Sequence, residues 1–174
     1  NQTLWFFAHE VAHLYQPGNT DGVSENNEQS WLHEGNADYF AALAMNFLYE
    51  DTSSYVENRT IRAFESCIEG LEQTTLANAY KTGHFNLYYS CGMIMHRAID
   101  NVVQQKTFGE ESLFTVWQRL QKAVSKGMPP GTTTFLTLLE PYNAPELMKA
   151  INDATRNDAL KAIQGIEALY QMNQ

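Results

Sequence analysis

The chain has 174 residues, of which 44% are hydrophobic and 18% are charged. This length allows one domain with a single core, and the composition is that of a globular protein rather than a disordered one. The net charge of −9 argues against binding to nucleic acid or to an anionic membrane, and no apolar run is long enough for a membrane-spanning helix.

Apolar residues recur at helical spacing along the chain, and no segment shows the alternation that is typical of a strand. The first helix is expected to be buried on most sides, because it is apolar and contains no Gly or Pro. A polar loop is expected at residues 17–29, and a loop or short helical turn at 74–85. Helices are expected at residues 3–15, 31–50, 54–71, 86–105, 110–126, 133–140, 144–153 and 158–172. The sequence therefore predicts an all-α, multihelical single domain.

The first helix carries the pattern His9-Glu10-Val11-Ala12-His13. Two histidines four residues apart lie on one helix face, where both can bind the same zinc ion, and the Glu between them is placed to act as a general base. The pattern lies on a strongly apolar helix, where these polar groups are unfavourable unless they are paired or bound to a metal. This favours a zinc site over a chance match.

A catalytic zinc needs a third protein ligand, and Glu34 is the candidate. Twenty residues separate it from His13, enough for the second helix to return antiparallel to the first. Asp38 follows one turn later, where its carboxylate can accept a hydrogen bond from a zinc-binding histidine. The role of His33 stays open between a partner of the ligands, a substrate contact and an exposed residue.

The two cysteines, Cys67 and Cys91, do not have the spacing of a metal site. They can form one disulfide in an extracytoplasmic protein or remain two buried thiols. Both lie in apolar helical patterns, which favours buried thiols.

The pattern HEVAH, a loop and then WLHEGNADYF resembles the gluzincin metallopeptidases. It is especially similar to the aminopeptidase N and leukotriene hydrolase family, and the pair Glu34 and Asp38 also resembles the arrangement in thermolysin. The gap before Glu34 is two residues longer than in that family, and His33 stands where Asn is usual. The resemblance implies the helical lobe of a gluzincin catalytic domain, with Zn²⁺ as cofactor.

The segment Tyr89-Ser90-Cys91-Gly92 is similar to the YxKG motif of the same family, with Cys in place of Lys. The resemblance implies that Tyr89 stabilises the oxyanion of the tetrahedral intermediate, and Tyr88 is the alternative. In the implied mechanism Glu10 takes a proton from a water at the zinc, and the water attacks a peptide carbonyl.

This resemblance predicts zinc-dependent hydrolysis of a peptide or protein substrate, of the aminopeptidase kind. Two alternatives remain: a gluzincin-like binding or scaffold domain without turnover, and a zinc hydrolase of a non-peptide substrate such as an epoxide.

Only eight residues precede His9, whereas the family carries a substrate-binding segment upstream of HExxH. Residues 1–174 are therefore expected to be the helical catalytic subdomain of a longer chain whose N-terminal β-rich part is missing. By itself the fragment is expected to lack part of its cleft. A periplasmic or secreted location is favoured over a cytoplasmic one.

Overall fold

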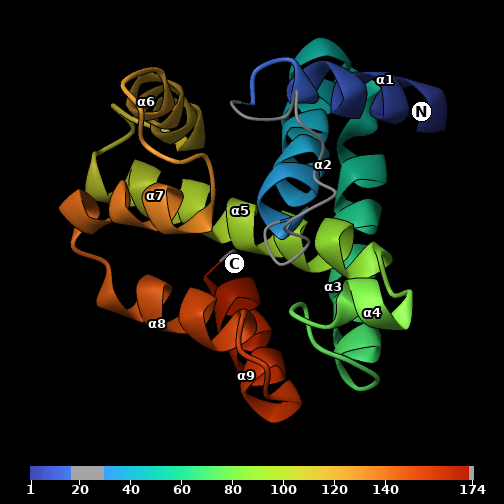
Figure 1. Cartoon of the computed structure of the whole chain (residues 1–174). Coiled ribbons are helices and arrows are strands. Elements are labelled where there is room, and N and C mark those ends of the chain that lie inside the picture. The colour runs from blue at the N-terminus through green and yellow to red at the C-terminus, as the bar shows by residue number, and fades with distance from the viewer. Residues whose placement is uncertain (17–29, 173–174) are drawn as a thin grey trace.

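The computed structural model describes residues 1–16 and 30–172, and the regular elements among them are all helical (Figure 1). They are α1 (Gln2–His13), α2 (Ser30–Leu48), η3 (Glu50–Thr52), α3 (Ser53–Leu71), α4 (Ala79–Thr82), α5 (Asn86–Lys106), α6 (Leu113–Ser125), α7 (Thr132–Thr137), η4 (Glu140–Tyr142), α8 (Pro145–Ala154) and α9 (Ala159–Gln171). The predicted all-α, multihelical single domain is confirmed. The polar loop predicted at 17–29 lies outside the described residues. None of the described helices is long and apolar enough to span a bilayer.

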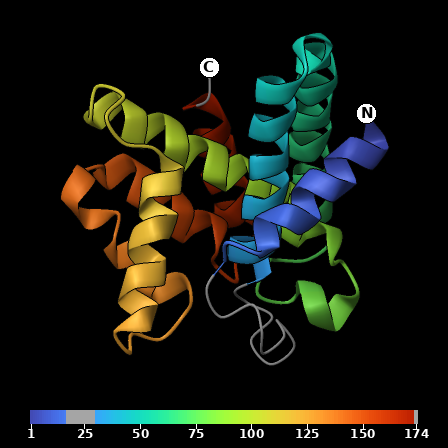
Figure 2. The ribbon, with the colours of Figure 1, turned by 90° about the horizontal axis from the view of Figure 1, so that it is seen from above.

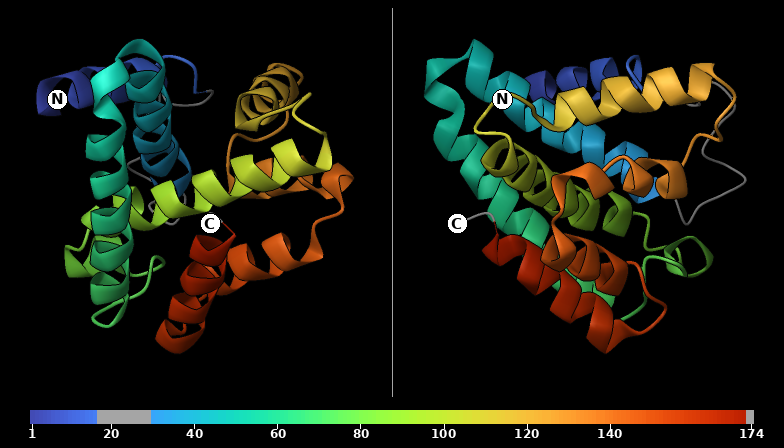
Figure 3. Two further views of the ribbon diagram at one scale, coloured as in Figure 1. Left: turned by 180° about the vertical axis from the view of Figure 1, so that it is seen from behind. Right: turned by 90° about the vertical axis from the view of Figure 1, so that its left-hand side faces the viewer.

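Helix α5 passes through the middle of the molecule, and most other helices pack around it (Figures 1 and 3). Its sequence is apolar on several sides, which suits a helix surrounded by neighbours. Leu87, Ile94 and Ile99 are among its fully buried side chains. Helices α2 and α3 cross its N-terminal half, and they are the elements that surround the candidate site.

Two of the predicted helix boundaries are wrong. The helix expected from residue 110 begins at Leu113, because Ser112 and Thr115 form a capping box and the buried Asp100 accepts a hydrogen bond from the Leu113 backbone. The helix expected at 133–140 stops at Thr137, and a separate 3₁₀ turn with Pro141 in it follows.

Among the described residues, helix α1 packs against its neighbours through one face only, so the expectation that it is buried on most sides is wrong. It crosses α2 obliquely on the outside of the molecule (Figure 2). The buried residues are Trp5, His9 and Ala12. An apolar stripe on the opposite side is exposed and comprises Leu4, Phe7, Val11 and Leu14. Apolar composition predicts the helix but does not say which of its faces has a neighbour.

Helices α2 and α5 approach each other closely at two glycines. A Cβ atom at Gly35 would lie 2.3 Å from the Cα atom of Gly92, and one at Gly92 would lie 2.5 Å from the carbonyl oxygen of Trp31. No side chain fits in such a contact. The segment that carries Glu34 is therefore held directly against the segment that carries Tyr89.

Cys67 of α3 and Cys91 of α5 form a disulfide, so the preference for buried thiols is wrong. Both residues are fully buried, as expected, but α3 and α5 pack side by side and bring the two sulfur atoms together. The spacing of 24 residues along the chain does not reveal this proximity.

The disulfide is expected to contribute about 2–4 kcal/mol to the free energy of unfolding, since it restricts the unfolded chain. The double substitution of Cys67 and Cys91 by Ala avoids burying a free polar group. Urea unfolding followed by circular dichroism should show this loss for the double variant, and about the same loss for the native chain under reducing conditions. Equal unfolding free energies with and without the disulfide would contradict the expectation.

Candidate metal centre

Helix α1 places His9 and His13 one turn apart, against the start of α2. His9 belongs to the buried face of α1, and the spacing of four residues brings His13 next to it. Their ring centroids are 4.8 Å apart, and the ring planes are inclined by 82°. Both Nε2 atoms face the same point, 3.1 Å from each other.

Glu34 of α2 completes a group of three. Its Oε2 atom lies 3.3 Å from Nε2 of His9 and 3.6 Å from Nε2 of His13. In a tetrahedral zinc site with bonds of about 2.0–2.1 Å, ligand atoms are separated by about 3.3–3.4 Å. The three observed separations lie close to this value, and two imidazoles with one carboxylate are an established donor set for catalytic zinc. The residues present therefore fit the ion that the sequence predicts.

Asp38 follows Glu34 by one turn and orients His9. Its Oδ1 atom lies 2.9 Å from Nδ1 of His9 and also accepts a hydrogen bond of 2.8 Å from Nε1 of Trp5. A carboxylate accepts hydrogen bonds, so Nδ1 of His9 carries a proton, and Nε2 is left to bind either a second proton or a cation. The sequence predicted Asp38 in this place, whereas the contribution of Trp5 became visible only in the fold.

Gln16 orients His13 in the same way, and sequence reasoning missed it. Its Oε1 atom lies 2.8 Å from Nδ1 of His13, and its Nε2 atom donates a hydrogen bond of 2.8 Å to the backbone carbonyl of His33. Because the amide nitrogen donates, the amide oxygen accepts the proton of Nδ1, and Nε2 of His13 presents its lone pair. Its position three residues after His13, in the turn that follows α1, is the signal that could have identified Gln16.

His33 contacts Gln16, the residue that orients His13. It is buried, its Nδ1 atom lies 3.3 Å from Oε1 of Gln16, and its ring contacts Trp117 edge-on. Burial lowers its pKa to about 4, so the ring is neutral near pH 7. Of the three roles left open, the structure places His33 as a partner behind the candidate ligands rather than as an exposed residue.

The three candidate ligands together attract positive charge. Two lone pairs 3.1 Å apart repel each other unless a proton or a cation lies between them. Burial disfavours the charged form of His9, but hydrogen bonds to Asp38 and Glu34 outweigh it and raise its pKa to about 9. Burial also opposes ionisation of Glu34, yet hydrogen bonds from His13 and His9 lower its pKa to about 2.

Glu10 and Tyr89 line one cavity of about 340 Å³ beside His9. Glu10 is exposed, and the ring of Tyr89 stacks on His9 with centroids 5.7 Å apart. Burial and the nearby charge of Glu34 raise the pKa of Tyr89 to about 12, so its hydroxyl keeps its proton near pH 7. Tyr88, the alternative, is buried, and its hydroxyl accepts a hydrogen bond from the backbone of Tyr80. Tyr89 is thus the tyrosine that borders the site.

Comparisons with protein-family models, with curated proteins and with solved structures find no match to this chain.

Proposed function

We propose that the chain is a zinc-dependent peptidase in which His9, His13 and Glu34 bind the ion. One observation carries the proposal: three donor atoms converge at separations of 3.1–3.6 Å, and each imidazole has its other nitrogen bonded to an acceptor. An accidental histidine–glutamate cluster does not require both Nε2 lone pairs to face inward. The order of the motifs along α1, α2 and α5 supports the resemblance to the helical lobe of a gluzincin catalytic domain.

His9, His13 and Glu34 would hold the zinc ion, which would supply a Lewis acid that activates water and polarises a substrate carbonyl. Glu10, in the adjoining cavity, accepts a proton from the attacking water and passes it to the leaving amine. The hydroxyl of Tyr89 donates a hydrogen bond to the oxyanion that develops on the carbonyl. Asp38 and Gln16 hold the two imidazoles in the tautomer that leaves Nε2 free to bind the ion.

The native chain is expected to bind one zinc ion, and Glu34→Gln is expected to lose it. Asp38→Asn should weaken zinc binding by about 10–100-fold, because the amide orients His9 less well. A competition titration with a chromophoric chelator measures both effects, and circular dichroism verifies the helices. Asp153→Asn is the matched control, since Asp153 is equally buried but pairs with Lys149 on α8. Unaltered zinc affinity in Glu34→Gln would rule out the assigned ligands.

Activity separates the proposal from its two alternatives. The zinc-loaded chain is incubated with peptides that have free or acetylated amino termini, and the products are identified by mass spectrometry. Cleavage that disappears on chelation and returns with zinc supports a peptidase. Stoichiometric zinc without cleavage of any peptide, both in this chain and in any longer protein that contains it, would instead favour the binding domain or the non-peptide hydrolase.

An extracytoplasmic location belongs to the same proposal. It is supported by the buried disulfide between Cys67 and Cys91, because such bonds persist mainly in oxidising compartments.

A further inference from the structure

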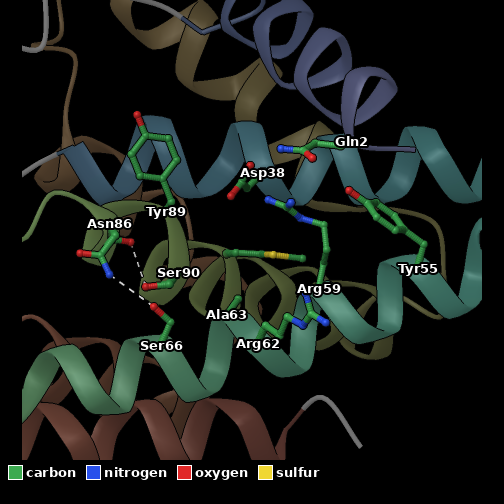
Figure 4. A pocket seen from close by; sticks show the side chains of 11 residues that line it. Gln2, Asp38, Tyr55, Arg59, Arg62, Ala63, Ser66, Asn86, Tyr89 and Ser90 are labelled. Carbon is green, nitrogen blue, oxygen red and sulfur yellow. Dashed lines mark hydrogen bonds between the residues drawn. The ribbon is translucent and has the colours of Figure 1, made fainter.

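A second cavity, of about 450 Å³, adjoins the candidate metal centre (Figure 4). Its walls come from α1, α2, α3 and α5. It shares Gln2, Asp38, Arg59 and Tyr89 with the smaller cavity that contains Glu10. A substrate bound at the candidate zinc ligands can therefore extend past Tyr89 into this space while it stays in contact with the protein.

The larger cavity carries more positive than negative charge, although the chain as a whole has a net charge of −9. Arg59 and Arg62 lie three residues apart on α3 and line the same wall. Neither has a carboxylate within ion-pair distance in the part of the chain that the structure describes. The acidic residue of this lining is Asp38, whose Oδ1 atom is already bonded to His9 and Trp5.

The guanidinium of Arg59 is held in place before any ligand arrives. It lies over the ring of Trp5, with 4.3 Å between its central carbon and the ring centroid. Trp5 is itself fixed, because it is buried and its Nε1 atom donates to Asp38. Figure 4 shows Arg59 extending from α3 toward Asp38. Stacking uses the face of the guanidinium and leaves its N–H groups free to donate within their plane.

Further hydrogen-bonding groups surround the two arginines. Asn86 donates to the hydroxyl of Ser66 at 3.3 Å, and the hydroxyl of Ser90 donates to the Asn86 backbone at 2.9 Å (Figure 4). Two arginines with polar neighbours match a carboxylate, which accepts paired hydrogen bonds from the planar guanidinium.

We propose that this cavity is a substrate subsite that binds a carboxylate next to the scissile bond. The carboxylate belongs to an acidic side chain or to a free carboxyl terminus of the peptide. The inference rests on the proposed peptidase function, which it deepens by naming the substrate class. Arg59 is the main contact, and Arg62 is the second.

Three peptides that differ only in charge test the subsite. One carries Glu near the cleaved bond and an amidated end, the second carries Gln with an amidated end, and the third carries Gln with a free carboxyl terminus. For the native chain, kcat/KM is expected to be about 10–100-fold higher for a carboxylate-bearing peptide than for the uncharged one. A higher kcat/KM for the first peptide would identify an acidic side chain as the source of the carboxylate, and a higher kcat/KM for the third would identify the free carboxyl terminus.

Substitution of the arginines should remove this preference. Arg59→Met keeps an unbranched side chain over Trp5, and Arg62→Met changes an exposed position whose loss does not threaten folding. Both variants should lower the ratio of kcat/KM for the carboxylate-bearing peptide to kcat/KM for the uncharged one. In Arg59→Met this ratio should fall toward one. Lys106→Met removes the same charge from the far end of α5, about 25 Å along the helix from Tyr89, and should keep the ratio. A native ratio of one, or a ratio unchanged in both arginine variants, overturns the subsite.

A binding measurement separates failure of the subsite from failure of the proposed peptidase. The same three peptides are titrated against metal-free protein by calorimetry. Tighter binding of a carboxylate-bearing peptide that disappears in Arg59→Met supports the subsite even if no peptide is ever cleaved. Equal binding of the three peptides, or no binding at all, overturns the subsite and leaves the zinc-dependent cleavage to stand by itself.

Discussion

The Glu10→Gln variant is expected to bind zinc like the native chain and to lose peptide hydrolysis by about 10²–10⁴-fold in kcat. Glu10 is exposed on α1 and is not one of the three converging groups, so its substitution leaves the ligands in place. Glutamine has nearly the same shape as glutamate but cannot accept the proton of the attacking water. The measurement combines zinc stoichiometry with steady-state kinetics on the best peptide.

The control for Glu10→Gln is Glu167→Gln, which makes the same chemical change at an exposed position of α9. It should retain native kinetics. Turnover by Glu10→Gln at the native rate would show that the residue between the two histidines is not the base, and the hydrolytic mechanism would have to be abandoned.

The Gly92→Ala variant is expected to damage both the fold and the metal centre. Its Cβ atom would lie 2.5 Å from the carbonyl oxygen of Trp31 and 2.7 Å from the Cα atom of Gly35, and backbone atoms cannot move aside as a side chain can. The helices α2 and α5 must separate, which costs about 1–3 kcal/mol or more of unfolding free energy. Glu34 and Tyr89 then shift apart, so zinc affinity should fall as well.

Urea unfolding and chelator competition on the same preparations measure the two effects of Gly92→Ala. Gly70→Ala is the matched control, because the three atoms nearest to the new Cβ atom all belong to the side chain of Leu87, which can rotate. It should lose less stability and keep its zinc affinity. Native stability and affinity in Gly92→Ala would mean that the glycine contact does not position Glu34.

Local spacing was sufficient to predict the residues that converge in the site. His9 and His13 share a helix face through their own periodicity, and Glu34 with Asp38 follows the same rule on the next helix. The helices themselves were predictable from apolar periodicity, because this periodicity is visible within the residues of each helix alone.

Residues that act through tertiary packing could not be predicted. Trp5 and Arg59 come from helices that are neighbours only in the folded chain, so nothing near either residue in the sequence signals their stacking. The disulfide between Cys67 and Cys91 has the same origin, since it depends on how α3 lies against α5. The exposure of the apolar stripe on α1 likewise depends on which side of α1 the other described helices pack.

Because α1 packs through a single face, its detachment from α2 is linked to whether a metal ion is bound at the proposed centre. Two of the three candidate ligands lie on α1 and the third lies on α2, so a bound ion bridges the two helices. Detachment of α1 breaks that bridge, and the free energy of this local unfolding must therefore rise with metal concentration. At 100 times the dissociation constant the increase is about 2.7 kcal/mol. The ion would thus hold in place the helix that supplies two of its proposed ligands and Glu10, the proposed general base.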